Sequence, residues 1–188
     1  VNAIEPFVKV SKFKCVKKVM YAATCSVYGV SDQAEVKEDH PLLPITDYNK
    51  FKALCEPILN NYVDENFHGV TIRPATVCGY SEKMRFDLTV NILTNLAYHK
   101  KEISVFGGEQ LRPNIHIMDM VRAYDYLINA SSNSVSGQIF NAGYENQTVN
   151  HLASLVKKVI GPDVKIKYLK SDDNRDRKST RLNSSHNQ

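Results

Sequence analysis

The sequence predicts a parallel α/β fold in which strands and crossover helices alternate along the chain. Short apolar runs suited to buried strands are separated by longer segments whose apolar residues recur every three or four positions. Strands that alternate with helices of this length favour a parallel sheet covered by helices. The 188 residues, 43% of them hydrophobic, suffice for one globular domain with a core.

The N-terminal part is expected to form a helix followed by a buried strand. Residues 1–15 begin directly in an amphipathic helical pattern. The apolar residues available for its buried side are Ile4, Phe7, Val8, Val10 and Phe13. The run Lys17–Ala23 is short and apolar, which suits a buried parallel strand, and polar residues follow it.

A long helix is predicted over residues 46–66. Thr46 or Asp47 can cap its N-terminus, and Gly69 follows as a stop signal. Its expected apolar stripe comprises Phe51, Cys55, Ile58, Leu59 and Tyr62. Pro57 lies inside this segment, where a proline removes a hydrogen bond, so a kink is expected there.

The remaining chain is predicted to alternate strands and helices. The expected strands are Val70–Val77, two short runs within 103–108 and 114–118 around a turn, 137–143 and 164–169. The expected helices are 86–99, with Leu88, Ile92, Leu93 and Leu96 buried, then 120–130 and 148–161. Asp119 is the predicted N-cap of the helix over 120–130.

Charge and hydropathy argue against two classes of partner. The formal net charge of +4 is spread along the chain without a basic run interleaved with aromatic residues, so nucleic-acid binding is not expected. The apolar runs fall well short of the about 20 residues that a membrane-spanning helix needs. No signal-peptide pattern opens the chain, and the expected location is the cytoplasm.

Cysteine and histidine usage predicts no metal site. Cys15, Cys25, Cys55 and Cys78 form no CxxC pair and have no histidine at ligand spacing, so neither a zinc site nor a disulfide framework is expected. We expect reduced, mostly buried thiols. His116 has no partner ligands in the sequence and is interpreted as a structural histidine.

Three polar residues are predicted to converge at the carboxyl end of the first strand. Thr24 follows that strand, and Tyr48 and Lys52 lie four residues apart on the helix over 46–66. A free tyrosine, with a pKa of about 10, is a poor base at neutral pH unless a nearby cation such as Lys52 stabilises its phenolate. Thr24 would orient a substrate hydroxyl. Oxidation of that alcohol implies a nicotinamide cofactor, because no side chain accepts a hydride.

Five motifs occur in an order and spacing that resemble a known family. They are TCSVYG at 24–29, YNKFK at 48–52, IRPATVCG at 72–79, GGEQLRPNIHIMD at 107–119 and FNAG at 140–143. Over about residues 2–169 the chain resembles the extended short-chain dehydrogenase/reductase family, the NAD-dependent nucleotide-sugar epimerases and dehydratases. The resemblance implies a partial Rossmann-type, doubly wound parallel sheet plus a small α/β substrate-binding region.

The same resemblance assigns roles to individual residues. Tyr48 would be the catalytic base and acid, Lys52 would also bind the nicotinamide ribose, and Thr24 would hydrogen-bond the sugar. Pro74 and Ala75 would lie beside the nicotinamide. The implied substrate contacts are Thr24, Thr76, Asn91, the backbone near Phe106, and Arg112, whose guanidinium suits diphosphate oxygens. The family often has Asn where this chain has Thr76, and Tyr where it has Cys78.

Compared with the family pattern, the chain is expected to be a fragment. The glycine-rich strand, turn and helix that receive the cofactor pyrophosphate do not occur in the sequence. Residues 1–80 are predicted as the later part of the NAD-binding domain, and 81–170 as mainly substrate-binding, with one strand returning to the Rossmann sheet. Residues 171–188 are predicted to be a disordered tail, which from Asp176 resembles a translated sequencing adapter. We expect the chain alone to bind NAD very weakly and to be inactive.

The function predicted for the parent protein is NAD-dependent nucleotide-sugar epimerisation, most simply at C4. A 4,6-dehydratase of this family typically carries an Asp-Glu pair directly after the catalytic Thr, where this chain has Cys25 and Ser26. A keto-sugar reductase using the same Tyr and Lys is a second alternative. A non-catalytic sugar-nucleotide binding protein is the alternative from another class. The nucleotide, the sugar and the choice of NAD over NADP are left open by the sequence.

The resemblance also predicts that the parent protein is a homodimer. Members of this family commonly pair two helices from each subunit in a four-helix bundle, and the helix of Tyr48 is one of them. Its expected outer stripe includes Leu54, Ile58 and Tyr62.

Overall fold

Helices and strands alternate along residues 2–31 and 35–169, which the computed structural model describes. The helices are α1 (Ile4–Phe13), the 3-10 helix η1 (Cys25–Tyr28), α2 (Asp47–Asn60), α3 (Thr89–Lys100), α4 (Ile117–Asn129), α5 (Ser132–Val135) and α6 (Val149–Ile160). The strands are β1 (Lys18–Ala22), β2 (His68–Pro74), β3 (Thr76–Cys78), β4 (Glu102–Phe106), β5 (Leu111–His116), β6 (Ile139–Ala142), β7 (Glu145–Thr148) and β8 (Lys165–Leu169). The tail predicted over 171–188 lies outside the described residues.

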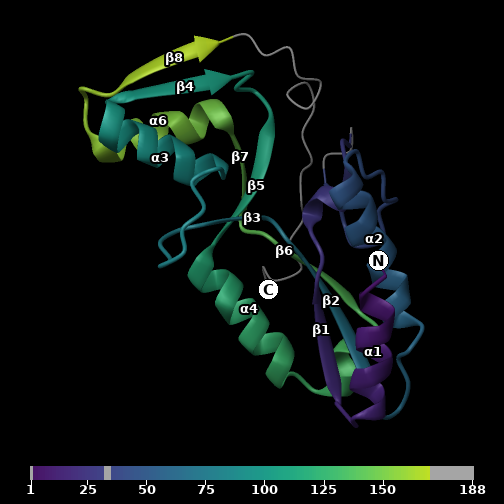
Figure 1. Ribbon diagram of the computed structural model, residues 1–188. Coiled ribbons are helices and arrows are strands. Elements are labelled where there is room, and N and C mark those ends of the chain that lie inside the picture. The colour runs from purple at the N-terminus through teal and green to yellow at the C-terminus, as the bar shows by residue number, and fades with distance from the viewer. Residues whose placement is uncertain (1, 32–34, 170–188) are drawn as a thin grey trace.

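Figure 1 shows two groups of elements, with α1 and α2 beside β1 and β2 in one and α3 and α6 beside β4 and β8 in the other. The first sheet is parallel throughout, in the order β1-β2-β6. Val70 and Ile72 of its central strand are fully buried and belong to one apolar cluster with Met120 and Leu127 of α4. Helices α1 and α2 cover the opposite face. Helices therefore cover both faces of this sheet, as a parallel sheet requires, and the predicted parallel α/β fold is confirmed.

Two smaller sheets complete the described fold. One has the order β3-β5-β7, with β3 parallel and β7 antiparallel to β5, and the other pairs β4 with β8 in parallel. The strands predicted around a turn are present but do not pair with each other. Ile103 and Val105 of β4 are buried in a separate core with α3 and α6. The glycines Gly107 and Gly108, both at positive φ, then lead the chain away to β5.

The strand predicted in one piece over Val70–Val77 is divided between two sheets. β2 ends at Pro74 and β3 begins at Thr76. Between them, the N–H of Ala75 donates to the carbonyl oxygen of Ala142 in β6 at 2.7 Å. The chain thus crosses from the first sheet to the second at the carboxyl end of β2.

Side-chain caps set where α2 and α4 begin. Thr46 is the N-cap of α2, as predicted, and its Oγ1 accepts from the N–H of Asn49 at 3.3 Å. The prediction of Asp119 as the N-cap of α4 is wrong, because His116 Nδ1 accepts from the N–H of Met118 at 3.2 Å and the helix begins earlier. His116 is therefore structural, as expected.

Helix α2 continues through Pro57 and ends earlier than predicted, at Asn60. Asp64 closes the following turn, because its carboxylate accepts two backbone N–H bonds at 2.9 Å. Gly69 is not the stop signal but lies within β2. A Cβ at Gly69 would come within 2.8 Å of the Leu59 side chain, so glycine lets α2 lie close to the sheet.

Helix α1 buries a narrower face than predicted. Val8 is fully buried, and Ile4 packs beside it in a cluster with Leu59 of α2 and Val19 of β1. Phe7, Val10 and Phe13 were expected on the buried side, but each is more than half exposed. In the described chain, α1 packs against α2 and against Val19 of β1.

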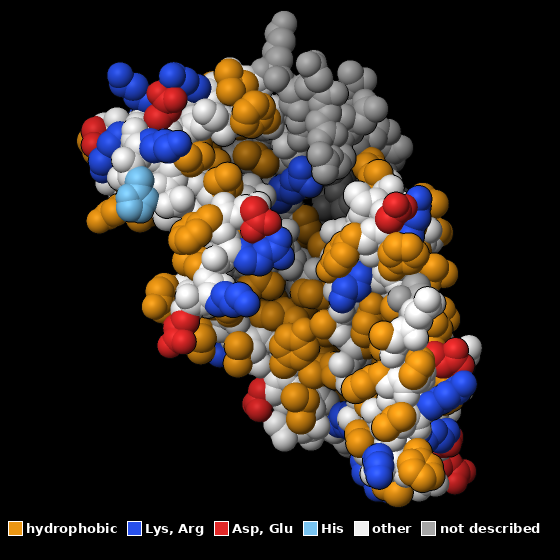
Figure 2. All heavy atoms as spheres, in the orientation of Figure 1, with side chains coloured by type: hydrophobic (Ala, Val, Ile, Leu, Met, Phe, Trp, Pro, Cys, Tyr) orange, Lys and Arg blue, Asp and Glu red, His pale blue; other side chains and the backbone are white. Residues whose placement is uncertain are grey.

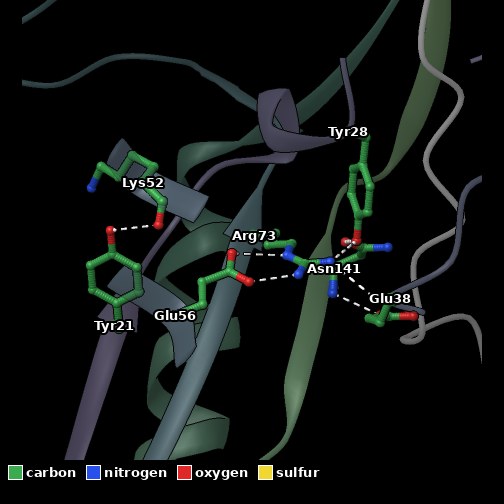
Figure 3. Close-up of polar contacts among 7 residues, drawn as sticks. All are labelled: Tyr21, Tyr28, Glu38, Lys52, Glu56, Arg73 and Asn141. Atoms are coloured by element: carbon green, nitrogen blue, oxygen red, sulfur yellow. Dashed lines mark hydrogen bonds and ion pairs between the residues drawn. The ribbon is translucent and has the colours of Figure 1, made fainter. Parts of the chain in front are cut away.

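A buried ion pair attaches α2 to the first sheet. Arg73 of β2 is 2% exposed and Glu56 of α2 is 4% exposed. Arg73 Nε donates to Glu56 Oε1 at 3.0 Å, and Nη2 donates to Oε2 at 2.6 Å (Figure 3). Two parallel charge-assisted bonds of this kind fix both the distance and the orientation of their partners.

The same guanidinium anchors the segment that precedes α2. Arg73 Nη1 donates to the Tyr28 hydroxyl at 2.6 Å and to the Glu38 carbonyl oxygen at 3.0 Å. Tyr28 donates to Asn141 Oδ1 at 2.6 Å, and the N–H of Asn141 donates to Glu38 Oε1 at 2.7 Å. One buried network therefore joins η1, α2, β2 and β6 (Figure 3).

Replacing Glu56 with alanine should lower the free energy of unfolding by about 3–5 kcal/mol, because Arg73 would stay buried without its counter-ion. Urea unfolding followed by circular dichroism measures the loss. Asp47→Ala is the matched control, since it removes an exposed ion pair with Lys50 on the same helix and should change stability little. Equal losses in the two variants would contradict the structural role of the buried pair.

Candidate active site

Thr24 lies between the end of β1 and the start of η1. Its Oγ1 accepts from the N–H of Ser26 at 3.2 Å, which caps η1, and its hydroxyl donates to Ser26 Oγ at 3.2 Å. Gly29 ends this helix at a φ of 67°, and a Cβ there would collide with the carbonyl oxygen of Leu43. Glycine therefore lets the segment before α2 pass close to η1.

Tyr48 and Lys52 reach the end of β1 from α2. Lys52 Nζ donates to the carbonyl oxygen of Ala22 at 2.7 Å. The same nitrogen lies 5.8 Å from the centroid of the Tyr48 ring and 5.2 Å from that of Tyr21. Among the described residues, Thr24 bonds within η1 rather than to this pair. The structure thus brings Tyr48 and Lys52 together, beside the strand end that leads into Thr24.

An open groove of about 490 Å³ lies beside this pair, between α1 and α2. Tyr48, Phe51 and Lys52 line it from α2, and Ile4 and Phe7 line it from α1. Tyr48 is 61% exposed, so its side chain is accessible to a ligand. The groove offers mainly apolar walls around the Lys52 ammonium.

Burial controls the protonation of the Cys25 thiol, which follows Thr24 in the sequence. It raises the pKa of Cys25 to about 12, and the nearby charge of Arg112 opposes this effect only weakly. Cys25 therefore stays a neutral thiol at physiological pH.

Arg85 lies in the loop between β3 and α3. Arg85 forms an exposed ion pair with Asp87, at 3.1 Å from Nε to Oδ1 and 2.6 Å from Nη2 to Oδ2. The bond to Asp87 raises the pKa of Arg85, and Tyr48 contributes a smaller rise. The Lys52 ammonium and the Arg112 guanidinium, whose charge opposes the rise in the pKa of Cys25, make the site suited to an anionic ligand.

Asn91 supports the loop that carries Arg85. The side chain is 5% exposed, its Nδ2 donates to the carbonyl oxygen of Arg85 at 2.9 Å, and its Oδ1 accepts from the N–H of Gly79 at 3.4 Å. These bonds hold both ends of the loop against α3. The direct diphosphate contact that the family resemblance suggests for Asn91 stays a prediction.

The other predicted contacts lie at strand ends. Pro74 and Ala75 follow the carboxyl end of β2, and Thr76 opens β3. Because β1 and β2 are parallel, Pro74 and Ala75 lie at the same edge of the sheet as Thr24. Phe106 is 53% exposed and ends β4, in the group of elements that contains α3 and α6 (Figure 1).

The described part of the chain contains neither a cluster of metal-ligating side chains nor a membrane-spanning helix. Within residues 2–31 and 35–169, no three His, Cys, Asp or Glu side chains gather in a way that could hold a metal ion. None of the described helices is long and apolar enough to cross a membrane. All four cysteines are free thiols. Cys25 and Cys55 are buried, but Cys78 is half-buried and Cys15 is exposed, so the prediction of mostly buried thiols holds only for two of them.

Tyr21, Glu56 and Arg73 shape this site but were not predicted from the sequence. Glu56 lies beside Cys55 on the buried side of α2, and Arg73 interrupts an otherwise apolar strand. A charged residue at a buried position of an apolar helix or strand pattern is a usable signal of a buried ion pair, because a buried charge needs a partner of opposite charge. Tyr21 gives no such signal, since tyrosine is common in strands.

Comparison with known proteins relates these motifs to one family. The sequence pattern of the NAD dependent epimerase/dehydratase family matches residues 6–143. UDP-arabinose 4-epimerase 1 of Arabidopsis thaliana is 26% identical over 175 residues, which cover 82% of this chain and 42% of the relative. UDP-glucose 4-epimerase of Bacillus subtilis is 25% identical over 172 residues, which cover 81% of this chain and 51% of the relative. The chain thus spans about half the length of these relatives.

Solved structures share the fold. UDP-N-acetylglucosamine 4-epimerase from Methanobrevibacter ruminantium matches with a TM-score of 0.85 at 23% identity, over 98% of this chain and 60% of that chain. UDP-glucuronic acid 4-epimerase from Bacillus cereus, in complex with NAD, matches with a TM-score of 0.81 at 24% identity, over 97% and 57% of the two chains. The predicted partial Rossmann-type fold is confirmed. With more than half of its residues matched by the family pattern, the chain belongs to the NAD dependent epimerase/dehydratase family.

Proposed function

We propose that the whole protein is an NAD-dependent nucleotide-sugar 4-epimerase and that this chain supplies its proton-transfer residues. The main support is the position of Lys52 Nζ, which donates to the Ala22 carbonyl oxygen and lies beside the Tyr48 ring. A phenol, an ammonium and the Thr24 hydroxyl near the carboxyl ends of parallel strands suit proton transfer on a sugar hydroxyl. The relatives named as 4-epimerases support this choice of reaction.

Tyr48 would act as both base and acid at C4. Its phenolate oxygen takes the proton of the C4 hydroxyl while the C4–H bond breaks, and the phenol returns that proton when the inverted alcohol forms. The Lys52 ammonium, 5.8 Å from the ring centroid, stabilises the phenolate. Thr24 would exchange its bond to Ser26 Oγ for one to the sugar hydroxyl, which orients the substrate.

The residues near this pair fit a nicotinamide cofactor. Tyr48 and Lys52 line an open groove, and Pro74 and Ala75 end the adjacent parallel strand. We infer that these four residues contact the nicotinamide and its ribose. Bound NAD would take up and return the hydride of C4, which no side chain can accept.

The positive charge of the site suits a nucleotide-diphosphate sugar. Arg112 presents a planar guanidinium that can bind two phosphate oxygens at once. Both relatives described above are named for UDP-sugars. We infer that Arg112 and Asn91 serve the diphosphate, the backbone near Phe106 the base, and Thr24 and Thr76 the sugar.

The residues after Thr24 favour epimerisation over dehydration. A 4,6-elimination needs an acid and a base at this point of the site. The Cys25 thiol is buried and its raised pKa, about 12, keeps it neutral. Ser26 Oγ accepts from Thr24 and is a weak acid and base.

We further propose that the whole protein is a homodimer through α1 and α2. Val10 of α1 and Leu54 of α2 are both more than half exposed, and Figure 2 shows hydrophobic side chains over this side of the molecule. Pairing both helices about a two-fold axis would bury them in a four-helix bundle. Tyr62, expected on this face, donates instead to Glu5 Oε1 at 2.8 Å, between the two helices.

Leu54→Asp in the whole protein should convert the dimer to a monomer, because a carboxylate would be buried at the proposed interface. Sedimentation velocity measures the change. Val159→Asp is the control, since Val159 is 82% exposed on α6, in the other group of elements. A wild-type monomer, or a Leu54→Asp dimer, would rule out this interface.

Tyr48→Phe in the whole protein should lower the rate of C4 epimerisation by about a hundredfold or more, because the base is lost. Lys52→Met should move the acidic limb of the pH profile to higher pH, because the phenolate loses its cation. Rates of epimer formation across a pH series give both results. Lys50→Met, an exposed lysine of the same helix, should leave the profile unchanged. Activity of Tyr48→Phe near the wild-type level would refute the assignment.

A further inference from the structure

Tyr21 of β1 contacts Lys52 at two points. Its hydroxyl donates to the backbone carbonyl oxygen of Lys52 at 3.2 Å (Figure 3). Its ring centroid lies 5.2 Å from Lys52 Nζ, a distance at which the face of an aromatic ring attracts a cation. The first contact joins β1 to the helical turn that carries Lys52, and the second acts on the tip of the side chain.

The remaining contacts of the Lys52 ammonium surround the same point. Nζ donates to the carbonyl oxygen of Ala22, the residue after Tyr21, and the Tyr48 ring lies 5.8 Å away. Two consecutive residues of β1 therefore hold the ammonium beside Tyr48. A lysine side chain has many rotamers, so contacts at its tip decide which one is occupied.

The hydroxyl of Tyr21 remains a donor throughout the pH range in which Tyr48 would act. Burial is the main cause that raises the pKa of Tyr21 well above its usual value. Tyr21 is therefore a phenol rather than a second base beside Tyr48.

We infer that Tyr21 is a positioning residue, whose ring and hydroxyl hold the Lys52 ammonium beside Tyr48. The catalytic consequence rests on the proposed function, whereas the contact itself does not. Lys50 on the same helix provides an internal comparison, because its ammonium pairs with Asp47 at 3.2 Å, at the exposed start of α2.

The contact is tested by acylating the lysines of the chain with acetic anhydride and following each site by mass spectrometry. Loss of the ring in Tyr21→Leu should raise the ratio of Lys52 to Lys50 labelling rates by about threefold. Tyr21→Phe retains the ring and should raise it less. Tyr62→Phe removes another tyrosine hydroxyl bonded beside α2 and should leave the ratio unchanged. An unchanged ratio in both Tyr21 variants overturns the inference, and Tyr21→Phe alone decides if the leucine variant does not fold.

The catalytic consequence is tested in the whole protein. Tyr21→Leu should lower kcat by about tenfold with little change in KM, because the phenolate of Tyr48 loses part of its stabilisation. The acidic limb of its pH profile should move to higher pH, while Tyr62→Phe keeps the wild-type profile. An increased labelling ratio with an unmoved pH limb would overturn the positioning role. Full activity of Tyr48→Phe would instead overturn the proposed function. The labelling experiment would still test the contact between Tyr21 and Lys52, because it does not depend on activity.

Discussion

The ion pair between Arg73 and Glu56 is the constraint on which the rest of the site depends. Glu56 lies one helical turn beyond Lys52 on α2, and Arg73 lies on β2, the neighbour of β1. Their two hydrogen bonds, at 3.0 and 2.6 Å, fix the height and rotation of α2 over the sheet. Because separating the pair would leave a buried charge without a partner, α2 has one strongly favoured position. That position brings Tyr48 to the end of β1.

The same guanidinium connects the two arms of the site. Tyr28 ends η1, the short helix that Thr24 caps, and its hydroxyl accepts from Arg73 Nη1. The segment before α2 is bonded to this nitrogen through the Glu38 carbonyl oxygen. The Arg73 guanidinium therefore helps to position both the hydroxyl of Thr24 and the ammonium of Lys52, although some twenty residues of sequence separate η1 from α2.

Features set by local spacing could be predicted from the sequence, and features set by distant partners could not. Tyr48 and Lys52 share a helical face because four residues make about one turn, whatever the rest of the chain does. The buried strand before Thr24 follows from its apolar run. The end of α2 depends on a carboxylate that closes the next turn, and the pairing of β4 with β8 depends on a core assembled from four separate elements. Tyr21 looks like any strand tyrosine until α2 lies against it.

The most direct measurement is to incubate the whole protein with NAD and each UDP-sugar for which its relatives are named. Proton NMR follows the sugar, and absorbance follows NADH in the same sample. Our account predicts that the C4 epimer accumulates to an equilibrium mixture while NADH stays constant, because the hydride and the proton both return to the sugar. Steady accumulation of NADH, or a 4-keto-6-deoxy product, would contradict it, since either result requires chemistry that Tyr48, Lys52 and Thr24 are not proposed to perform.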